Sequence, residues 1–292
     1  MNLPHLVHAG SASDPLVVVR SDFWNFQGIG TWSGDEALVI DPGFYPEDIA
    51  LLSAAVRTRV ERSIPRRVRH VVLTHSHHDH IRGWQRFPDA EITMPQVAAD
   101  KPADAQKRIL AAKRTIDDSL GIDDRTFTWP VPDRTFEESC TLEFGAARAE
   151  LHFLPGHSNC SCVVWLPHVR TLCTADYLVS PGLPYCRWEM PAFESALTWI
   201  ELFVRREGVR RVVPAHNHIL EGQDTILRAL ALETEYVAVL RNTLENRPPG
   251  EDPARGQTLA LQAMKNWRGS QTRAEVRQDR DNAQRMQQAL TD

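Results

Sequence analysis

The stretch RHVVLTHSHHDHIRGW, residues 69–84, decides the fold of this chain. It places four histidines and an aspartate within six residues, directly after the apolar run Val71–Leu73. Exposed loops seldom concentrate histidine in this way, and a strand in front of the segment points it at one spot. Neutral imidazole and carboxylate are the ligands that suit Zn²⁺ and related first-row ions. The pattern therefore predicts a metal centre at the end of a strand.

Alternation along the segment separates its histidines into two groups. His75 and His77 point to one side of an extended chain, and Asp79 and His80 begin the following turn and can face the same cavity. Four donors within six residues are more than one open tetrahedral site needs, so we expect two metal ions. His78 is expected to face away from His77 and to lie behind the ligands or at the surface.

Three more candidate ligands follow predicted strands farther along the chain. His157 comes after LHFLPG, Asp176 after RTLCTA and His216 after RRVVPA. Ligands of α/β sheets collect in the loops outside the carboxyl ends of the strands. We therefore expect these three donors to meet the cluster at 75–80.

Two alternatives stay open among the neighbouring residues. His218 competes with His216 for the last ligand position. The Cys-x-Cys pair of Cys160 and Cys162 fits either burial in the next strand or an additional thiolate ligand site.

A Pro- and Gly-rich stretch, DYLVSPGLPYCRWEM at 176–190, is expected to run over the site. In it, Tyr185 could hydrogen-bond a developing oxyanion, and Arg187 could bind a carboxylate or phosphate of the substrate. Aromatic packing under a long loop is the alternative for both residues.

The segment THSHHDH, residues 74–80, resembles the His-x-His-x-Asp-His signature of the metallo-β-lactamase superfamily, and the later donors follow in that family's order. The resemblance covers roughly residues 16–222. It implies an α/β (α+β) fold, a four-layer αβ/βα sandwich with a dinuclear metal site at one edge. It implies two divalent metal ions; Zn²⁺ is the preferred identity, and Fe and Mn are the alternatives. It assigns His75, His77 and His157 to the first ion, Asp79, His80 and His216 to the second, and Asp176 as the bridge. The candidate catalytic residues are Asp79 and Asp176.

The sequence departs from the family pattern at a few positions. Arg82-Gly83 stands where the family often has two glycines, and the resemblance then implies a cation close to the entrance of the second metal site. Alanine precedes both Asp176 and His216 where glycine is common. These changes leave the ligand set intact.

The composition and net charge limit the classes of partner that we expect for this chain. The net charge of -5 and a pI near 6.2 argue against broad attraction to nucleic acid. The N-terminus lacks a secretory signal, no apolar run is long enough to span a membrane, and the five cysteines are an odd number. We expect a cytoplasmic protein that acts on a small-molecule acyl substrate without a nucleic-acid or membrane partner; a homodimer is left open.

The order of the predicted elements suggests two domains. Strands are expected between 16 and 41 and at 68–73, with a helix at 46–63 between them and a helical segment at 96–120. Four short strands follow up to 175, then a helix at 192–206 and a strand at 210–216. From this order we expect a catalytic domain at 1–222 and a helical C-terminal cap at 223–292. The charge-rich last helix, 273–290, is expected to present a solvated face.

The chemistry that follows is hydrolysis, because a hydroxide held by two cations is a nucleophile at neutral pH. The chain resembles the thioesterase and lactonase branches of the superfamily, so a small ester, thioester or lactone is the expected substrate. The alternatives are a phosphodiester, a β-lactam, an iron-dependent oxidative reaction, or a ligand-binding protein whose catalytic activity is vestigial.

Overall fold

The computed structural model describes residues 4–58, 64–179, 184–246, 253–268 and 273–290. Within these ranges the chain is mixed α/β with two sheets and seven α-helices, which confirms the expected fold class. Its internal contacts divide it into two compact units. The first comprises Met1–Phe153, Cys160–Ala175 and Ala215–Asn217, and the second comprises Leu154–Asn159, Asp176–Pro214 and His218–Asp292.

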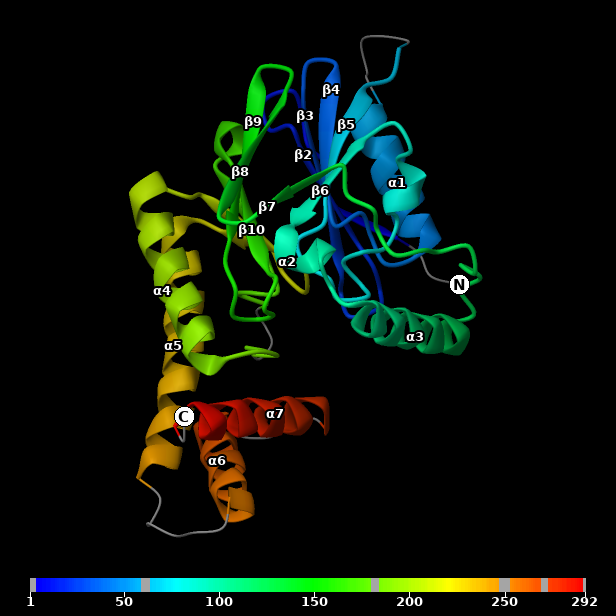
Figure 1. The fold of residues 1–292 in the computed structure, drawn as a ribbon. Coiled ribbons are helices and arrows are strands. Elements are labelled where there is room, and N and C mark those ends of the chain that lie inside the picture. The colour runs from blue at the N-terminus through cyan, green and yellow to red at the C-terminus, as the bar shows by residue number, and fades with distance from the viewer. Residues whose placement is uncertain (1–3, 59–63, 180–183, 247–252, 269–272, 291–292) are drawn as a thin grey trace. The chain divides into compact units, whose positions relative to one another are not determined.

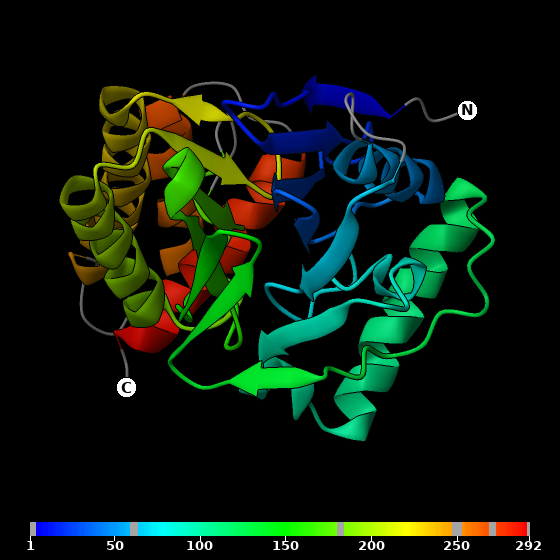
Figure 2. The same cartoon turned by 90° about the horizontal axis from the view of Figure 1, so that it is seen from above.

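A mixed sheet of seven strands, β1 to β7 in sequence order, lies in the first unit. The strands are β1 (His5–His8), β2 (Leu16–Arg20), β3 (Gln27–Ser33), β4 (Glu36–Ile40), β5 (Arg67–Val72), β6 (Glu91–Pro95) and β7 (Arg134–Phe136). Pairing is antiparallel from β1 to β4 and parallel from β4 to β7. Figure 2 shows this order as a change of colour from dark blue to green. The strands expected between 16 and 41 and at 68–73 are confirmed, whereas the short strands β1, β6 and β7 were missed.

Helix α1 (Pro46–Arg57) packs on this sheet through contacts with β2, β3 and β5 (Figure 1). Proline at its first position suits a helix start, because its fixed φ is helical and its missing N–H would have no partner there. The buried side of the helix consists of Ile49, Leu52 and Val56, as the spacing predicts. Full burial of each such side chain contributes about 1.5–3 kcal/mol. The expected continuation to residue 63, with Val60, lies outside the described residues.

The helical segment expected at 96–120 is two helices, α2 (Gln96–Ala99) and α3 (Ala103–Leu120). Pro102 explains the interruption, because proline disfavours helical backbone in the residue before it. Helix α3 buries two charged residues, Lys113 and Asp117.

Four strands of the second sheet belong to the first unit, in the order β11-β10-β9-β8. They are β8 (Ser139–Phe144), β9 (Ala147–Phe153), β10 (Cys162–Leu166) and β11 (Thr171–Ala175), paired antiparallel. Every residue of β10 and β11 is buried, which agrees with their nearly continuous apolar sequences. All four strands confirm the sequence prediction.

The second unit is mostly helical. Its elements are α4 (Met190–Glu207), β12 (Arg211–Pro214), β13 (Leu220–Glu221), α5 (Gln223–Glu245), α6 (Pro253–Arg268) and α7 (Arg273–Ala289). Helices α4 and α5 run side by side, and α7 contacts α4, α5 and α6 (Figure 1). None of the described helices is long and apolar enough to cross a membrane. A domain boundary at residue 222 stays a prediction.

Helix α7 differs from the solvated helix expected from its charges. Asp279 and Asn282 are 0% and 1% exposed. The Tyr236 hydroxyl donates to Asp279 Oδ1 at 2.8 Å, and Asn282 Nδ2 donates to the Tyr236 oxygen at 2.8 Å. A buried polar side chain is tolerated when its hydrogen bonds are made, and these partners lie more than 40 positions away in sequence. The expectation of a solvated face was therefore wrong for these positions.

Candidate metal centre

The histidine cluster begins where β5 ends. His75 Nε2 lies 2.8 Å from His77 Nδ1, and the ring centroids of His75 and His80 are 3.8 Å apart. His78 lies beside a different group, with its ring centroid 5.7 Å from that of Trp24. The turn therefore gathers three imidazoles and directs the fourth against an aromatic side chain.

Asp79, His80 and His216 form a second group in the same unit. One ligand atom of each lies within 4.8 Å of the others. Asp79 Oδ2 is 3.7 Å from His80 Nε2 and 3.4 Å from His216 Nε2. Burial opposes ionisation of Asp79, but the neighbouring imidazoles of His80 and His216 outweigh it and hold the pKa of this carboxyl well below its usual range. The carboxylate is thus anionic, as a metal ligand must be.

A buried carboxylate that the sequence analysis missed, Asp41, orients His80. It follows β4 and accepts hydrogen bonds from His80 Nδ1 at 2.8 Å, from the Thr74 backbone N–H at 2.9 Å and from the Thr74 hydroxyl at 2.6 Å. Donation from Nδ1 leaves the lone pair of His80 on Nε2, the atom nearest Asp79. The signal was present in the sequence, because Asp41 directly follows the apolar strand ALVI.

Asp41→Asn is expected to weaken divalent metal binding by about 10–100-fold, because the amide cannot accept all three hydrogen bonds and His80 loses its fixed tautomer. Competition with a chromophoric chelator measures the affinity. Exposed Asp89, changed to Asn, is the matched control and should bind metal as the wild type does. Equal metal affinities for Asp41→Asn and wild type would show that Asp41 does not support the metal centre.

The loop at Trp24, which the sequence analysis did not identify, orients His216. Its Nδ1 donates to the Trp24 carbonyl at 3.0 Å, and the Phe26 ring lies 5.3 Å from its ring and 5.1 Å from that of His80. Trp24 and the residue after it have φ angles of 56° and 48°, a left-handed turn that aims this carbonyl at His216. The competitor, His218, is exposed and belongs to the second unit.

The second unit brings His157 and Asp176 together. His157 Nε2 lies 3.0 Å from Asp176 Oδ2, while His157 Nδ1 donates to the Tyr185 carbonyl at 2.6 Å. The His157 backbone N–H donates to the Tyr177 hydroxyl, which itself donates to a carbonyl at the end of β9. Both the backbone and the ring of His157 are therefore fixed, with Nε2 turned to the carboxylate.

Asn282 of helix α7 hydrogen-bonds to the segment whose carbonyl orients His157. Asn282 Nδ2 donates to the Pro184 carbonyl at 2.6 Å, and the Cys186 N–H donates to Asn282 Oδ1 at 3.1 Å. These two bonds bracket Tyr185, whose carbonyl accepts from His157. A residue near the C-terminus thus fixes the acceptor of a candidate ligand.

We expect Asn282→Ala to lower the melting temperature by several degrees and metal affinity by about tenfold, since the carbonyl that orients His157 loses both supports. Calorimetry and chelator competition measure the two effects. Asn242→Ala, on the exposed side of α5, is the control. Unchanged metal affinity with a lowered melting temperature would show that Asn282 only stabilises the fold.

Tyr185 and Arg187 make contacts within the second unit. The Tyr185 hydroxyl donates to Asp281 Oδ2 at 3.1 Å, and the Arg187 guanidinium carbon lies 5.1 Å from the centre of the Tyr185 ring. Arg187 is exposed. The contacts of Tyr185 agree with the packing alternative, and a role of either residue in substrate binding stays a prediction.

Glu233 of α5 is a buried acid whose carboxyl contacts the segment directly after Asp176. Burial raises the pKa of Glu233 to about 8, although the backbone N–H groups of Leu178 and Val179 donate to its carboxyl and oppose the rise. Because the folded state holds this proton up to about pH 8 and the unfolded state releases it near 4.5, stability should fall as pH rises between these values.

Glu233→Gln is therefore expected to flatten this dependence and to raise the melting temperature at pH 8.5 more than at pH 5. Scanning calorimetry across that pH range measures it. The exposed neighbour Glu235, changed to Gln, should leave the wild-type curve unaltered. Parallel curves for wild type and Glu233→Gln would contradict the assignment.

The Cys-x-Cys pair is buried in the first unit. Cys160 and Cys162 are both 0% exposed, and the Cys160 sulfur lies 3.2 Å from the Ser76 hydroxyl. Burial raises the pKa of the Cys162 thiol well above its usual value, which disfavours the thiolate that a metal requires. These observations favour the packing alternative.

Seven predicted ligands thus lie in two sets. His75, His77, Asp79, His80 and His216 gather in the first unit, and His157 and Asp176 gather in the second. Within each set the donor types suit a divalent cation. That the two sets form one dinuclear site stays a prediction.

Comparisons with known proteins agree with the fold. A family model described as the metallo-beta-lactamase superfamily matches residues 30–216. A metallo-beta-lactamase from Pontibacter korlensis is 20% identical with a TM-score of 0.56, covering 79% of this chain and 99% of that one. The inverting sec-alkylsulfatase Pisa1 from Pseudomonas sp. is 14% identical with a TM-score of 0.63, covering 94% of this chain and 50% of that one. This chain therefore spans about half the sulfatase's length. No curated protein matches it.

Proposed function

Since the chain belongs to the metallo-β-lactamase superfamily, whose members are generally hydrolases, we propose that it hydrolyses a small ester, thioester or lactone with a metal-activated water. The observation that supports this most strongly is the group of Asp79, His80 and His216. Its ligand atoms lie within 4.8 Å, and both imidazoles donate from Nδ1 to fixed acceptors.

The residues present fit a divalent cation. The carboxylate of Asp79 is ionised, and His80 and His216 direct Nε2 towards it. Burial of such a group without a cation is costly, because an anion and several lone pairs then lie in a low-dielectric region. We propose that His75, His77 and His157 hold one ion, that Asp79, His80 and His216 hold a second, and that Asp176 bridges them. Zn²⁺ suits this mixture of imidazole and carboxylate ligands, with Fe or Mn as alternatives.

When bound, two such ions lower the pKa of a shared water and polarise the bond to be cleaved. The chain's own residues position the ligands. Asp41 and the Trp24 carbonyl fix the tautomers of His80 and His216, and the Tyr185 carbonyl fixes that of His157. We propose that Asp176, whose Oδ2 lies 3.0 Å from His157 Nε2, would orient the attacking water or accept its proton.

Aromatic side chains suggest an apolar group on the substrate. Trp24 is 48% exposed, and its ring lies 4.5 Å from that of Phe23 and 5.7 Å from that of His78. An exposed aromatic surface beside the histidine cluster can bind an alkyl or aryl substituent. This favours a small hydrophobic acyl substrate over a long polyanion such as RNA.

A substrate panel tests the proposal. Metal-loaded protein is assayed on acyl-thioesters, aryl esters and lactones, with bis-p-nitrophenyl phosphate, a β-lactam and a secondary alkyl sulfate as the competing classes. The alkyl sulfate is included because one similar structure is a sec-alkylsulfatase. We expect the highest kcat/KM on the carboxyl esters, and a His77→Ala preparation made in parallel excludes a contaminant. No turnover of any carboxyl ester by protein with two bound metals would contradict the proposal.

A further inference from the structure

A carboxyl group lies in the middle of the buried side of α5. Glu233 is 7% exposed and occupies a position where the helical spacing favours an apolar residue. The buried side of the helix consists of Ile226, Ala229, Leu230, Glu233, Tyr236, Val237, Leu240 and Leu244. Burying a carboxyl costs free energy unless it forms hydrogen bonds, so the partners of Glu233 indicate its role.

The partners of Glu233 are two consecutive backbone N–H groups. Leu178 and Val179 donate to its carboxyl, and Oε2 has no hydrogen-bond partner among the described residues. The two donors follow Asp176, a candidate ligand, by two and three positions. The buried carboxyl therefore acts on the backbone that leads away from Asp176.

The backbone on both sides of Asp176 is strained. Ala175 has a φ of 49° and Leu178 a φ of 60°, so both adopt the left-handed region that favours glycine. A residue such as leucine persists there only when its surroundings impose the conformation, and such residues cluster at functional sites. Because the N–H of Leu178 itself donates to Glu233, the carboxyl contributes directly to holding this conformation.

The same segment supports both candidate ligands of the second unit. Asp176 Oδ2 lies 3.0 Å from His157 Nε2, and the hydroxyl of Tyr177 accepts from the His157 backbone N–H at 3.0 Å. Tyr177 and Leu178 are both fully buried. A change of the backbone at Leu178 would therefore shift the Asp176 carboxylate and the Tyr177 hydroxyl together.

We propose that Glu233 is a positioning residue for Asp176: its carboxyl fixes the turn after Asp176 and thereby the direction of the Asp176 carboxylate. The inference rests on the proposed function, in which Asp176 bridges two metal ions. Burial raises the pKa of Glu233 to about 8, so the side chain is uncharged at pH 7. Glutamine can then replace it without loss of an accepting oxygen.

Amide hydrogen exchange in the metal-free, full-length protein tests the contact itself. In Glu233→Met, which keeps the length of the side chain but has no accepting oxygen, the Leu178 and Val179 amides should exchange at least tenfold faster than in wild type. Glu233→Gln should keep their protection, and the amides of β10 report any change in global stability. Glu233→Asp withdraws the carboxyl by one carbon and provides the same test if Glu233→Met does not fold.

Chelator competition then measures the consequence for metal binding. We expect Glu233→Met to bind the more weakly held ion about 10–100-fold less tightly, and Glu233→Gln to bind it within twofold of wild type. Leu240→Ala, about two turns farther along the buried side of α5, should lower the melting temperature but keep the metal affinity.

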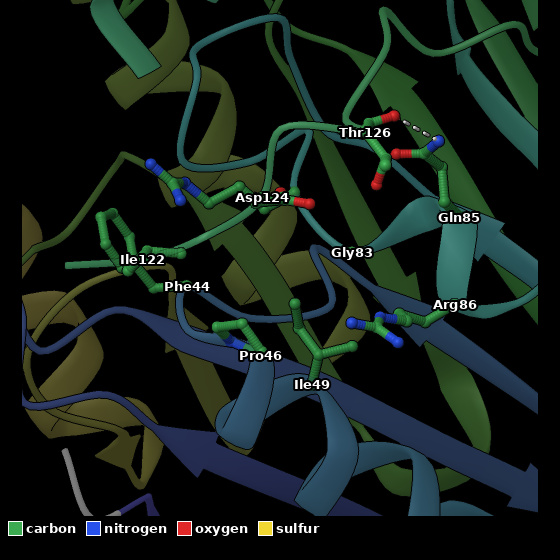
Figure 3. A pocket seen from close by; sticks show the side chains of 10 residues that line it. Phe44, Pro46, Ile49, Gly83, Gln85, Arg86, Ile122, Asp124 and Thr126 are labelled. Carbon is green, nitrogen blue, oxygen red and sulfur yellow. Dashed lines mark hydrogen bonds between the residues drawn. The ribbon is translucent and has the colours of Figure 1, made fainter. Parts of the chain in front are cut away.

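Gln85→Ala is a second control, in the first unit. Gln85 is exposed and lines a cavity, where its Nε2 donates to the Thr126 carbonyl at 3.3 Å (Figure 3). Its replacement also removes a hydrogen bond from a side chain to the backbone of another segment. We expect this variant to bind metal as the wild type does.

Four results would overturn the proposal. The Leu178 and Val179 amides of Glu233→Met could stay as protected as in wild type, or that variant could keep wild-type metal affinity. Glu233→Gln could fail to restore metal affinity, or Leu240→Ala could lose it to the same extent as Glu233→Met. Absence of ester turnover by the wild type would contradict the proposed function alone, because neither amide exchange nor metal affinity depends on the substrate.

Discussion

His77→Ala is expected to lose about a thousandfold in kcat/KM, roughly 4 kcal/mol of transition-state stabilisation, and at least one of two bound metal ions. His78→Ala should leave both nearly unchanged. The structure gives the physical reason: His77 Nδ1 lies 2.8 Å from His75 Nε2, whereas the His78 ring lies beside Trp24. If His77 is a ligand as we propose, its removal would open the coordination sphere, whereas removal of His78 would leave it intact.

Metal analysis after dialysis, together with kcat/KM on the best ester of the panel, measures both effects. His77 and His78 are neighbours in the same turn, and both variants replace a histidine by alanine. Each variant is therefore the control for the other. Equal damage from His78→Ala would show that the alternation assigned to this turn is out of phase. Full metal content in His77→Ala would exclude His77 as a ligand.

Asp176→Ala is expected to lower activity at least as strongly, about a thousandfold or more, and to reduce metal content from two ions towards one. A bridging carboxylate neutralises part of the charge of both cations, so its loss weakens the binding of the second ion. His157 also loses the carboxylate that lies 3.0 Å from its Nε2.

Asp224→Ala is the matched control for that change, because it removes an exposed carboxylate from the same unit, in the first turn of α5. It should keep both ions and full activity. An Asp176→Ala protein that retains two ions and more than a tenth of the activity would show that Asp176 does not bridge them.

The elements that carry the fold follow from local sequence. Strands β8 to β11 are short apolar runs bounded by turn residues, and α1 has a helical spacing of Ile49, Leu52 and Val56 that matches its buried side. The short strands β1, β6 and β7 were missed because three to five residues carry too little periodicity and depend on their neighbours for pairing.

The candidate ligands could be predicted because their chemistry is visible in the residue types, but the groups that orient them could not. Asp41, the Trp24 carbonyl and the Tyr185 carbonyl act through contacts between segments that are distant in sequence. Two of these acceptors are backbone atoms, which no residue type reveals.

The burial of polar residues in α7 was also not predicted from the sequence. The pattern of α7 contains so few apolar residues that a solvated helix is the natural prediction, yet Asp279 and Asn282 are buried against Tyr236 and the segment at 184–186. Hydrophobic periodicity cannot detect a helix that is buried through satisfied hydrogen bonds.

The central claim is that the donors of the two units bind two metal ions at one site. Anomalous diffraction from crystals of the metal-loaded protein tests it most directly. The account predicts two peaks about 3.5–4 Å apart, with His157 contacting one ion and Asp176 contacting both. A single ion held by His75 and His77 alone, with His157 and Asp176 remote from any metal, would contradict it.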